Sequence, residues 1–192
     1  MDKIIAITGG IGSGKSTVSQ IIKELGYKVF SADEVYSELL KDEKFVKNIY
    51  KTLEIETDSL VYDRDLVSSK VFNNKEMLEK LNSATHPHIM FKMLTQSKNE
   101  SGIVFNEVPL LFEAGYEKLY DNVIIVSRNL DSRVDAVSKR DNLSKEKVLL
   151  RINNQIDYAK IESNAHTLIV NDGSLEELTI KVKAVVDSIA KV

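Results

Sequence analysis

The sequence predicts an α/β fold with a mainly parallel β-sheet, and three observations support this fold class. An apolar run at residues 4–7 leads through a glycine-rich loop into residues 18–25, where apolar side chains share one helical face. Further short apolar runs follow at 102–106, 123–126 and 167–170. The segments between these runs are long enough for helices, and strands that alternate with helices are typical of parallel sheets.

The glycine-rich loop at residues 9–16 fits the Walker A pattern, Gly-x4-Gly-Lys-Ser, in the required position between a strand and a helix. Glycines allow the backbone to curl so that several N–H groups converge on phosphate oxygens, and the helix adds the positive end of its dipole. Lys15 would reach the β- and γ-phosphates, and the Ser16 hydroxyl would ligate Mg²⁺. A turn that only joins strand to helix is the weaker interpretation, so the loop predicts a nucleoside triphosphate site. The predicted nucleotide-binding residues are Gly10, Ile11, Gly12, Ser13, Gly14, Lys15, Ser16 and Thr17.

Length and composition are those of one ordinary globular domain. The chain has 192 residues and a net charge of −3, so we expect no large basic surface for nucleic acid. It contains no cysteine, which excludes disulfides and thiolate metal sites. No apolar run approaches ~20 residues, and the first strand starts without a signal-peptide pattern. We therefore expect no membrane span, no secretory signal and a cytoplasmic location.

A second short strand is expected at residues 27–30, and Asp33 follows its carboxyl end. Ligands of open α/β sheets gather outside the carboxyl ends of the strands, so Asp33 is expected on the same side as the glycine loop. This position makes Asp33 a candidate catalytic residue. An aspartate ahead of the helical segment 34–39 is also a good helix N-cap, and on spacing alone both interpretations stay open.

The stretch from about 42 to 95 is predicted to be a helical insertion that covers one edge of the sheet. It lacks strand-like alternation, while apolar residues recur at helical spacing around Phe45 and again around Met77. Pro87 is expected in the first turn of a further helix. The apolar residues of this stretch are interpreted as core rather than as a ligand site, because burial is their usual role.

Two later segments carry charges that suit phosphoryl transfer. Glu107 ends the strand expected at 102–106, and P-loop proteins commonly place their second Mg²⁺-holding group after such a strand. Glu113 fits a solvated surface charge equally well. The segment 128–155 is rich in arginine and is either an exposed helical pair or a mobile lid over the phosphates.

The C-terminal part of the chain completes the predicted fold. Ser174 and Glu177 have the spacing of a capping box that opens a terminal helix after the strand at 167–170. The three histidines lack the spacing of a metal cage, so no zinc site is expected.

Several of these stretches together resemble the dephospho-coenzyme A kinases, which are P-loop kinases of the nucleoside-monophosphate-kinase type. The resemblance runs in the family's order across nearly the whole chain. The P-loop is shared by many NTPases, whereas the two stretches around His86 and Pro109 are much more specific. The matching pieces are 7–16, Ala32-Asp33, Val71-Phe72, His86-Pro87-x-Ile89, 108–113, Arg140-Asp141-x-Leu143-Ser144, Arg151-Ile152-x-x-Gln155 and 171–174.

The resemblance implies a three-layer P-loop NTPase fold in one kinase domain, 1–192, with a substrate-binding insertion at about 42–95 and a lid at about 139–158. The implied reaction is phosphorylation of the ribose 3′-hydroxyl of dephospho-coenzyme A by ATP with Mg²⁺. Asp33 would be the base or orienter at that hydroxyl, and Arg140 a lid arginine that acts with Lys15 on the phosphates. The protein would be a monomer or weak homo-oligomer. The implied substrate-binding residues are Asp33, His86, Pro109, Leu110 and Phe112. The implied Mg²⁺ site is Ser16 and Glu107, the latter directly or through water.

The chain departs from the family pattern at four positions. Ser31 and Glu107 stand where aspartates are usual, Ala136 replaces a common arginine, and Arg133 falls where glutamine is common. Another P-loop small-molecule kinase, of the nucleoside monophosphate or shikimate type, is the main alternative function. A nucleotide-dependent switch is disfavoured because no Asn-Lys-x-Asp motif for guanine is present, and a structural domain with a vestigial loop would not bind ATP.

Overall fold

The computed structural model describes residues 2–72, 74–156, 158–161 and 166–191. The chain folds into two compact units, Met1–Phe30 with Glu100–Val192, and Ser31–Asn99. The insertion predicted at about 42–95 falls within the second unit. The first unit contains the glycine loop and the parallel sheet.

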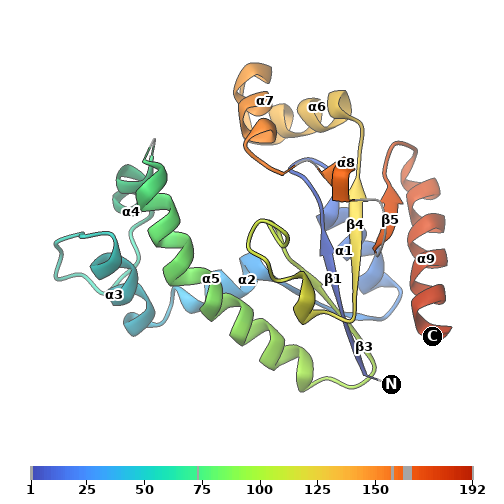
Figure 1. Cartoon of the computed structure of the whole chain (residues 1–192), viewed down its shortest axis with the longest axis horizontal. Helices are drawn as coiled ribbons and strands as arrows, with labels where there is room; N and C mark the ends of the chain where they lie inside the picture. The colour runs from blue at the N-terminus through green and yellow to red at the C-terminus, as the bar shows by residue number, and fades with distance from the viewer. Residues whose placement is uncertain (1, 73, 157, 162–165, 192) are drawn as a thin grey trace. The chain divides into compact units, whose positions relative to one another are not determined.

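The sheet has the strand order β2-β3-β1-β4-β5 in the described part of the chain, with β1 in the middle (Figure 1). The pairs β1–β3, β1–β4 and β4–β5 are all parallel, and their registers include Ile5 opposite Phe105 and Ile7 opposite Ile124. The predicted α/β architecture with a mainly parallel sheet is therefore confirmed. The strands are β1 (Lys3–Thr8), β2 (Lys28–Ser31), β3 (Ile103–Glu107), β4 (Asn122–Ser127) and β5 (Thr167–Val170).

Helices α1 (Lys15–Glu24) and α9 (Leu175–Lys191) pack together and cover one face of this sheet. Their buried aliphatic side chains form one core cluster with alternate residues of the strands, among them Ile5, Ile22 and Val182. The capping box predicted at the start of α9 is confirmed. The Ser174 N–H donates to Glu177 Oε2 at 3.1 Å, and the Glu177 N–H donates to Ser174 Oγ at 3.2 Å.

A second helical layer of the first unit is the pair α6 (Leu130–Asp141) and α7 (Lys145–Asn153), which lie side by side (Figure 1). Their facing valines form a separate apolar cluster, and Ile11 of the glycine loop packs against it. The 3₁₀ turn η1 (Glu117–Leu119) and the short helix α8 (Tyr158–Ile161) complete this unit. The α6–α7 pair is thus attached to the loop by apolar contact.

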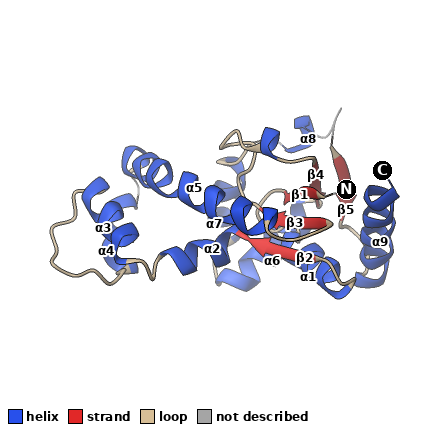
Figure 2. Ribbon diagram, turned by 90° about the horizontal axis from the view of Figure 1, so that it is seen from below, coloured by secondary structure: helices blue, strands red, loops and turns tan. Residues whose placement is uncertain are grey.

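Apart from Ser31, which ends β2, the secondary-structure elements described for the second unit are all helices (Figure 2). Three of its helices begin at polar side chains that accept backbone N–H groups, namely Asp42, Asp63 and Asn74. Buried apolar residues of α3 and Val67 of α4 form its core. The helices are α2 (Ala32–Leu39), α3 (Glu43–Thr52), α4 (Arg64–Val71) and α5 (Lys75–Lys98).

The further helix expected to begin at Pro87 is wrong, because α5 is one helix of 24 residues with Pro87 inside it. A proline in a helix interior removes one backbone hydrogen bond but leaves the rest of the ladder intact. Thr85, Ile89 and Met93 are buried on either side of it. The burial of these residues on one face of α5 outweighs the local cost of the proline.

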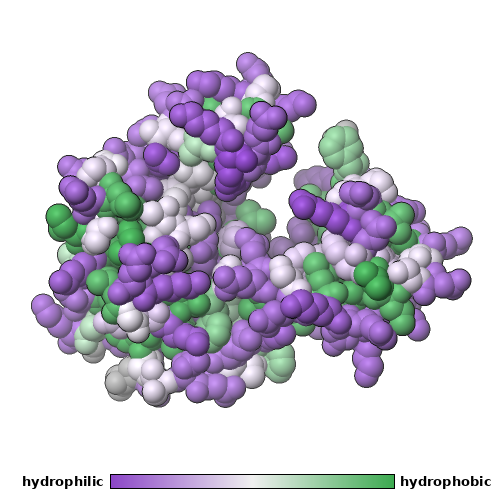
Figure 3. Space-filling model, turned by 180° about the vertical axis from the view of Figure 1, so that it is seen from behind, coloured by the Kyte–Doolittle hydropathy of each residue, from purple (hydrophilic) through white to green (hydrophobic). Residues whose placement is uncertain are grey.

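The described helices include none that is both long and apolar enough to cross a membrane. The face drawn in Figure 3 is largely hydrophilic, with apolar side chains between the hydrophilic ones. Single exposed apolar residues are normal on such a surface.

Candidate active site

The glycine loop connects the central strand β1 to the first turn of α1. Gly9, Gly12 and Gly14 have φ values of 147°, 77° and 96°, a region that favours glycine. A Cβ atom on Gly9 would collide with the Val126 carbonyl oxygen, and one on Gly14 would collide with Asn171 Nδ2. The glycines are therefore required both for the backbone turn and for the close approach of neighbouring segments.

Lys15 is the first residue of α1, and its ammonium group folds over the beginning of the loop. Lys15 Nζ donates to the carbonyl oxygens of Gly9 at 2.8 Å and Gly10 at 3.2 Å. The first N–H groups of an α-helix have no partner within the helix and carry the positive end of its dipole. A lysine and these amides converge on one spot, which is the arrangement that binds phosphate.

Ser16 and Glu107 lie next to each other beside the loop. Ser16 Oγ donates to Glu107 Oε1 at 3.2 Å, although the two residues are 91 positions apart in the sequence. A hydroxyl and one carboxylate suit Mg²⁺, which usually keeps several waters and takes further oxygens from substrate phosphates. No group of three acidic or histidine residues that could hold a metal occurs among the described residues. The donors present thus fit a Mg²⁺ ion that enters with its nucleotide.

Three side chains from distant segments fix the shape of the loop, and the sequence did not predict this role for any of them. Arg133 Nε donates to the Ile11 carbonyl oxygen at 2.9 Å, and the Ile11 N–H donates to Gln155 Oε1 at 2.7 Å. Asn171 Nδ2 donates to the carbonyl oxygen of Ser13 at 2.9 Å. These partners are 122 to 158 residues from the loop in sequence, so no local pattern reveals the pairing.

A cleft of about 380 Å³ opens beside the loop in the same unit. Its walls come from the loop at Gly10, from the end of β4 and the residue after it, and from the α6–α7 pair. Two guanidinium groups, those of Arg128 and Arg133, line it. A cleft with cationic walls beside a phosphate-binding loop is suited to a polyanionic ligand.

Arg140, the predicted lid arginine, lies at the end of α6 and pairs with its neighbour. Arg140 Nε is 2.7 Å from Asp141 Oδ1, and Arg151 Nη1 is 3.2 Å from Asp141 Oδ2. The hydrogen bond from Arg140 is the main reason that the pKa of Asp141 lies below its ordinary value. In this structure Arg140 therefore contacts Asp141, and its contact with phosphate remains a prediction.

Asp33 lies in the first turn of α2, in the second unit. The N-cap interpretation is wrong, because the helix begins one residue earlier and Ser31 occupies the N-cap position. The Asp33 side chain is exposed, and no hydrogen bond or ion pair of its carboxylate occurs within the described residues. The carboxylate is accordingly available to a ligand.

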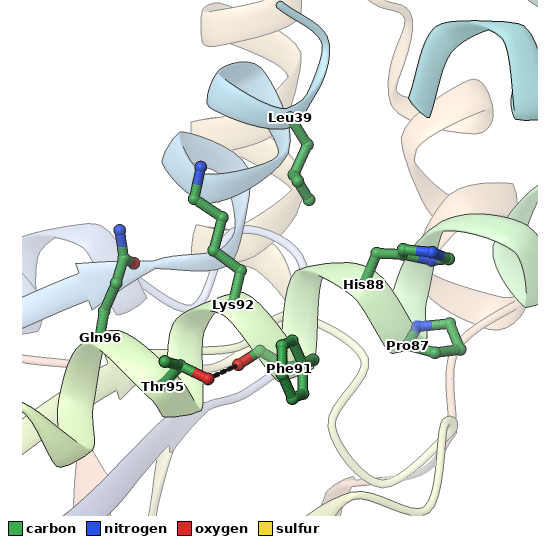
Figure 4. A pocket seen from close by; sticks show the side chains of 7 residues that line it. All are labelled: Leu39, Pro87, His88, Phe91, Lys92, Thr95 and Gln96. Carbon is green, nitrogen blue, oxygen red and sulfur yellow. Dashed lines mark hydrogen bonds between the residues drawn. The ribbon is translucent and has the colours of Figure 1, made fainter. Parts of the chain in front are cut away.

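His86 is half-buried in α5, and burial lowers its pKa below the ordinary value. A groove of about 590 Å³ lies along the same helix, where Pro87, His88 and Phe91 approach Lys92 and Leu39 of α2 (Figure 4). Figure 4 shows the Phe91 ring and the Lys92 chain on this surface, with Lys92 beside α2. The groove is mostly apolar with one cation at its side.

The loop after β3 contains the three other predicted substrate residues, Pro109, Leu110 and Phe112. Leu110 has a φ of 58°, which is uncommon for a residue other than glycine and marks a constrained backbone. The Phe112 ring packs edge to face against Tyr158 and His166, with centroids 6.3 and 5.1 Å apart. The sequence pattern at Glu113 fitted a solvated surface charge. In the structure, the carboxylate of Glu113 accepts a hydrogen bond from the Tyr158 hydroxyl at 3.3 Å.

A central parallel strand, a Walker A loop and the helix that begins at its lysine define a P-loop nucleotide-binding enzyme. Within that class, the family model for dephospho-CoA kinase matches residues 3–177. The chain belongs to the dephospho-CoA kinase family.

Individual relatives agree with this assignment. A dephospho-CoA kinase of Fusobacterium nucleatum is 34% identical over 190 residues, which cover 97% of this chain and 98% of the relative. A solved structure of a Thermus thermophilus protein superposes with a TM-score of 0.82 at 32% identity and covers 97% of both chains. A dephospho-CoA kinase structure from Campylobacter jejuni has a TM-score of 0.72 at 31% identity and covers 100% of this chain and 98% of that one. The predicted P-loop kinase fold and family are confirmed.

Proposed function

We propose that the protein transfers the γ-phosphoryl group of ATP to the ribose 3′-hydroxyl of dephospho-coenzyme A, which yields coenzyme A and ADP. The observation that carries this proposal is the family match over residues 3–177, which includes both the phosphate-binding loop and the helical second unit. The loop geometry supports ATP as the phosphoryl donor. The alternative acceptors, nucleoside monophosphates and shikimate, are not favoured by the relatives found.

The phosphate end of the site acts by positioning reactants and offsetting charge, because phosphoryl transfer leaves little covalent work for side chains. The loop N–H groups and the Lys15 ammonium would bind the β- and γ-phosphates. Ser16 and Glu107 would hold Mg²⁺, which would supply positive charge against the charge that develops during transfer. Arg140 would add charge to the phosphates after exchanging its contact with Asp141.

The acceptor end of the site depends on Asp33. Its carboxylate would accept a hydrogen bond from the ribose hydroxyl and take the proton late in the transfer. Its exposure and the lack of an internal partner among the described residues support this role. The insertion at about 42–95 would bind the pantetheine arm, with His86 in it, while Pro109, Leu110 and Phe112 would contact substrate from the loop after β3.

We further propose that residues 1–192 act as a single kinase domain, with residues 139–158 as a lid that closes over the phosphates and excludes water. Water in the site would hydrolyse ATP without a useful product. The net charge of −3 supports a small-molecule substrate rather than nucleic acid. A cytoplasmic location and a monomeric or weakly associating state complete the proposal.

A coupled ADP-release assay with several acceptors tests the reaction. Dephospho-coenzyme A, AMP and shikimate are offered separately with ATP and Mg²⁺, and phosphorus NMR of the product locates the new phosphate. Acceptor-dependent ADP release with dephospho-coenzyme A, and phosphate on the 3′-oxygen, is the expected result. A preference for either other acceptor overturns the proposal.

A further inference from the structure

Arg133 is placed over the glycine loop by helix α6. Its Nε donates to the Ile11 carbonyl oxygen at 2.9 Å. A Cβ atom on Gly10 would collide with Arg133 Nη2 and would lie 2.9 Å from Cζ, so the outer part of the guanidinium lies directly above Gly10. One N–H of the group is therefore used to fix its position, and Arg133 is also one of the residues that line the cleft beside the loop.

Burial together with the lack of an ion pair distinguishes Arg133 from the other cations of the α6–α7 pair. Arg140 and Arg151 share Asp141, Lys145 pairs with Asp135, and Lys139 and Lys147 are exposed. Arg133 makes no ion pair with any carboxylate that the structure describes, yet it is half-buried, and burial lowers its pKa. A desolvated charge without a counter-ion is unfavourable in the free protein and becomes favourable when an anion binds beside it.

The position of Lys15 identifies which part of an anion would lie there. In a Walker A loop the lysine reaches the β- and γ-phosphates. Lys15 Nζ contacts the carbonyl oxygens of Gly9 and Gly10, and Arg133 covers Gly10 from the side of α6. Two cations thus flank the same residue at the β/γ end of the loop.

We propose that Arg133 is a further catalytic residue, whose terminal nitrogens contact the γ-phosphoryl group of ATP during transfer. This inference rests on the proposed function for the identity of the donor. Charge spreads over the equatorial phosphoryl oxygens in the transition state, and an arginine held in place stabilises it without reorganisation. The bond to Ile11 supplies that pre-organisation.

Gln155 holds the same residue of the loop, Ile11, through its N–H group. Its Oε1 accepts the Ile11 N–H at 2.7 Å, and the Ile11 side chain packs on the apolar cluster of α6 and α7. Separation of α6 from the loop would break the hydrogen bond of Arg133, and separation of the segment after α7 would break that of Gln155. Arg133 is thereby fixed to the loop itself rather than carried by a free helix end.

Four variants separate a phosphate contact from a structural clamp. Arg133→Gln keeps an N–H donor for the Ile11 carbonyl oxygen but loses the charge, Arg133→Lys keeps the charge, and Arg133→Ala loses both. Lys183→Gln is the matched control, because it removes one positive charge from an exposed position of α9 in the same unit, outside the loop, the cleft and the proposed lid. Thermal unfolding of each variant checks that the fold is intact.

Turnover and titration calorimetry with Mg²⁺–ATP and Mg²⁺–ADP are the measurements. We expect Arg133→Gln to lower kcat by about 10²-fold or more, and Arg133→Lys to recover part of the loss. Arg133→Gln should weaken the binding of ATP at least about tenfold more than the binding of ADP, because only ATP has the γ-phosphate. Lys183→Gln should keep both kcat and the nucleotide dissociation constants within about threefold of the unmutated protein.

The proposal is overturned if the kcat of Arg133→Gln stays within about threefold of that of the unmutated protein while the kcat of Arg133→Ala falls further. The hydrogen bond to Ile11 alone would then explain the role of the residue. An equal loss of affinity for ATP and ADP in Arg133→Gln overturns the proposal too. The nucleotide titration does not depend on the acceptor. A failure to phosphorylate dephospho-coenzyme A would therefore refute the proposed function and leave the test of Arg133 intact.

Discussion

The hydroxyl of Ser16 lies 3.2 Å from a carboxylate oxygen of Glu107, and the sheet itself creates this contact. Strands β1 and β3 are parallel neighbours, and Ile7, near the end of β1, is in register with Glu107 at the end of β3. The loop that leaves β1 returns Ser16 to the same edge of the sheet. A carboxylate beside the hydroxyl of a Walker A motif is the feature that a Mg²⁺–nucleotide site requires.

Replacing Glu107 should change the requirement for Mg²⁺. Glu107→Gln removes the charge but keeps the shape, so we expect the half-saturating Mg²⁺ concentration to rise by about 10- to 100-fold, the usual cost of losing a group that holds or orients a metal. Glu107→Asp restores the charge and should recover most of the activity. Turnover measured against Mg²⁺ concentration at saturating ATP checks both variants. Identical Mg²⁺ curves for all three proteins would remove Glu107 from the site.

Replacing Asp33 should affect the chemistry and spare nucleotide binding. Asp33→Asn keeps the first turn of α2 intact, since the Asp33 carboxylate does not cap the helix. We expect kcat to fall by about 10²-fold or more, the usual scale of general base assistance. The ATP dissociation constant from calorimetry should be nearly unchanged, which serves as the internal control. A kcat close to that of the unmutated protein would exclude Asp33 from proton transfer.

Two glycines with similar backbone angles allow the loop to be tested separately from stability. Gly14 and Gly26 have φ values of 96° and 92°, but only at Gly14 would a Cβ meet another side chain, that of Asn171. Alanine at either site should cost about 1–2 kcal/mol of unfolding free energy from backbone strain. Only Gly14→Ala should also weaken ATP binding, by about tenfold or more, because the loop must shift. Urea unfolding and ATP titration of both variants decide this, and equal ATP affinities would contradict it.

The fold was predictable where local chemistry and tertiary packing agree. The Walker A loop and the Ser174–Glu177 capping box are local patterns, and the structure has the loop between β1 and α1 and both hydrogen bonds of the box. The helix boundary expected at Pro87 failed, because a local preference was outweighed by the buried face of α5. The N-cap of α2 was expected at Asp33 but lies at Ser31, whose side chain makes no cap hydrogen bond, so the capping preference of aspartate did not decide where this helix begins.

The candidate site was predictable only in its contiguous part. Lys15 and Ser16 belong to one motif, and strand order could bring Glu107 to the same edge. The contacts of Arg133 and Gln155 with Ile11 cross more than a hundred residues. Such pairings follow from how α6 and α7 pack on the loop, and single-sequence periodicity contains no information about them.

The proline inside α5 should limit the stability of the second unit. Pro87 is exposed and lacks the N–H that would otherwise bond to the carbonyl of Ser83. We expect Pro87→Ala to raise the unfolding free energy by about 1–3 kcal/mol. Ser83→Ala, one turn earlier and also exposed, is the control and should gain about 0.5 kcal/mol from propensity alone. Urea unfolding followed by circular dichroism gives both values, and a loss of stability in Pro87→Ala would show that the helix depends on the ring.

The lowered pKa of His86 predicts how stability depends on pH. Burial disfavours the charged imidazole in the folded protein, so the unfolded chain binds the proton more readily. Stability from this group is fully present above about pH 6.5, the unfolded value, and is lost as pH falls through the folded pKa. Carboxylates whose pKa is lowered, such as Asp141, act only at more acidic pH. Unfolding between pH 7.5 and 5.5 therefore separates the histidines from these carboxylates, and variants identify the histidine responsible.

We expect the urea midpoint of the unmutated protein to decrease when the pH is lowered from 7.5 to 5.5. The decrease should be smaller in His86→Gln, because glutamine cannot take up a proton. His88→Gln, on an exposed neighbour in the same helix, is the matched control and should keep the full pH dependence. Unfolding curves at both pH values, recorded without ligand, compare the three proteins. If His86→Gln and the unmutated protein lose the same stability on acidification, then burial of His86 does not govern the response in this range. The same variant, assayed for its KM for dephospho-coenzyme A at pH 7.5, reports separately on the proposed contact between His86 and the substrate.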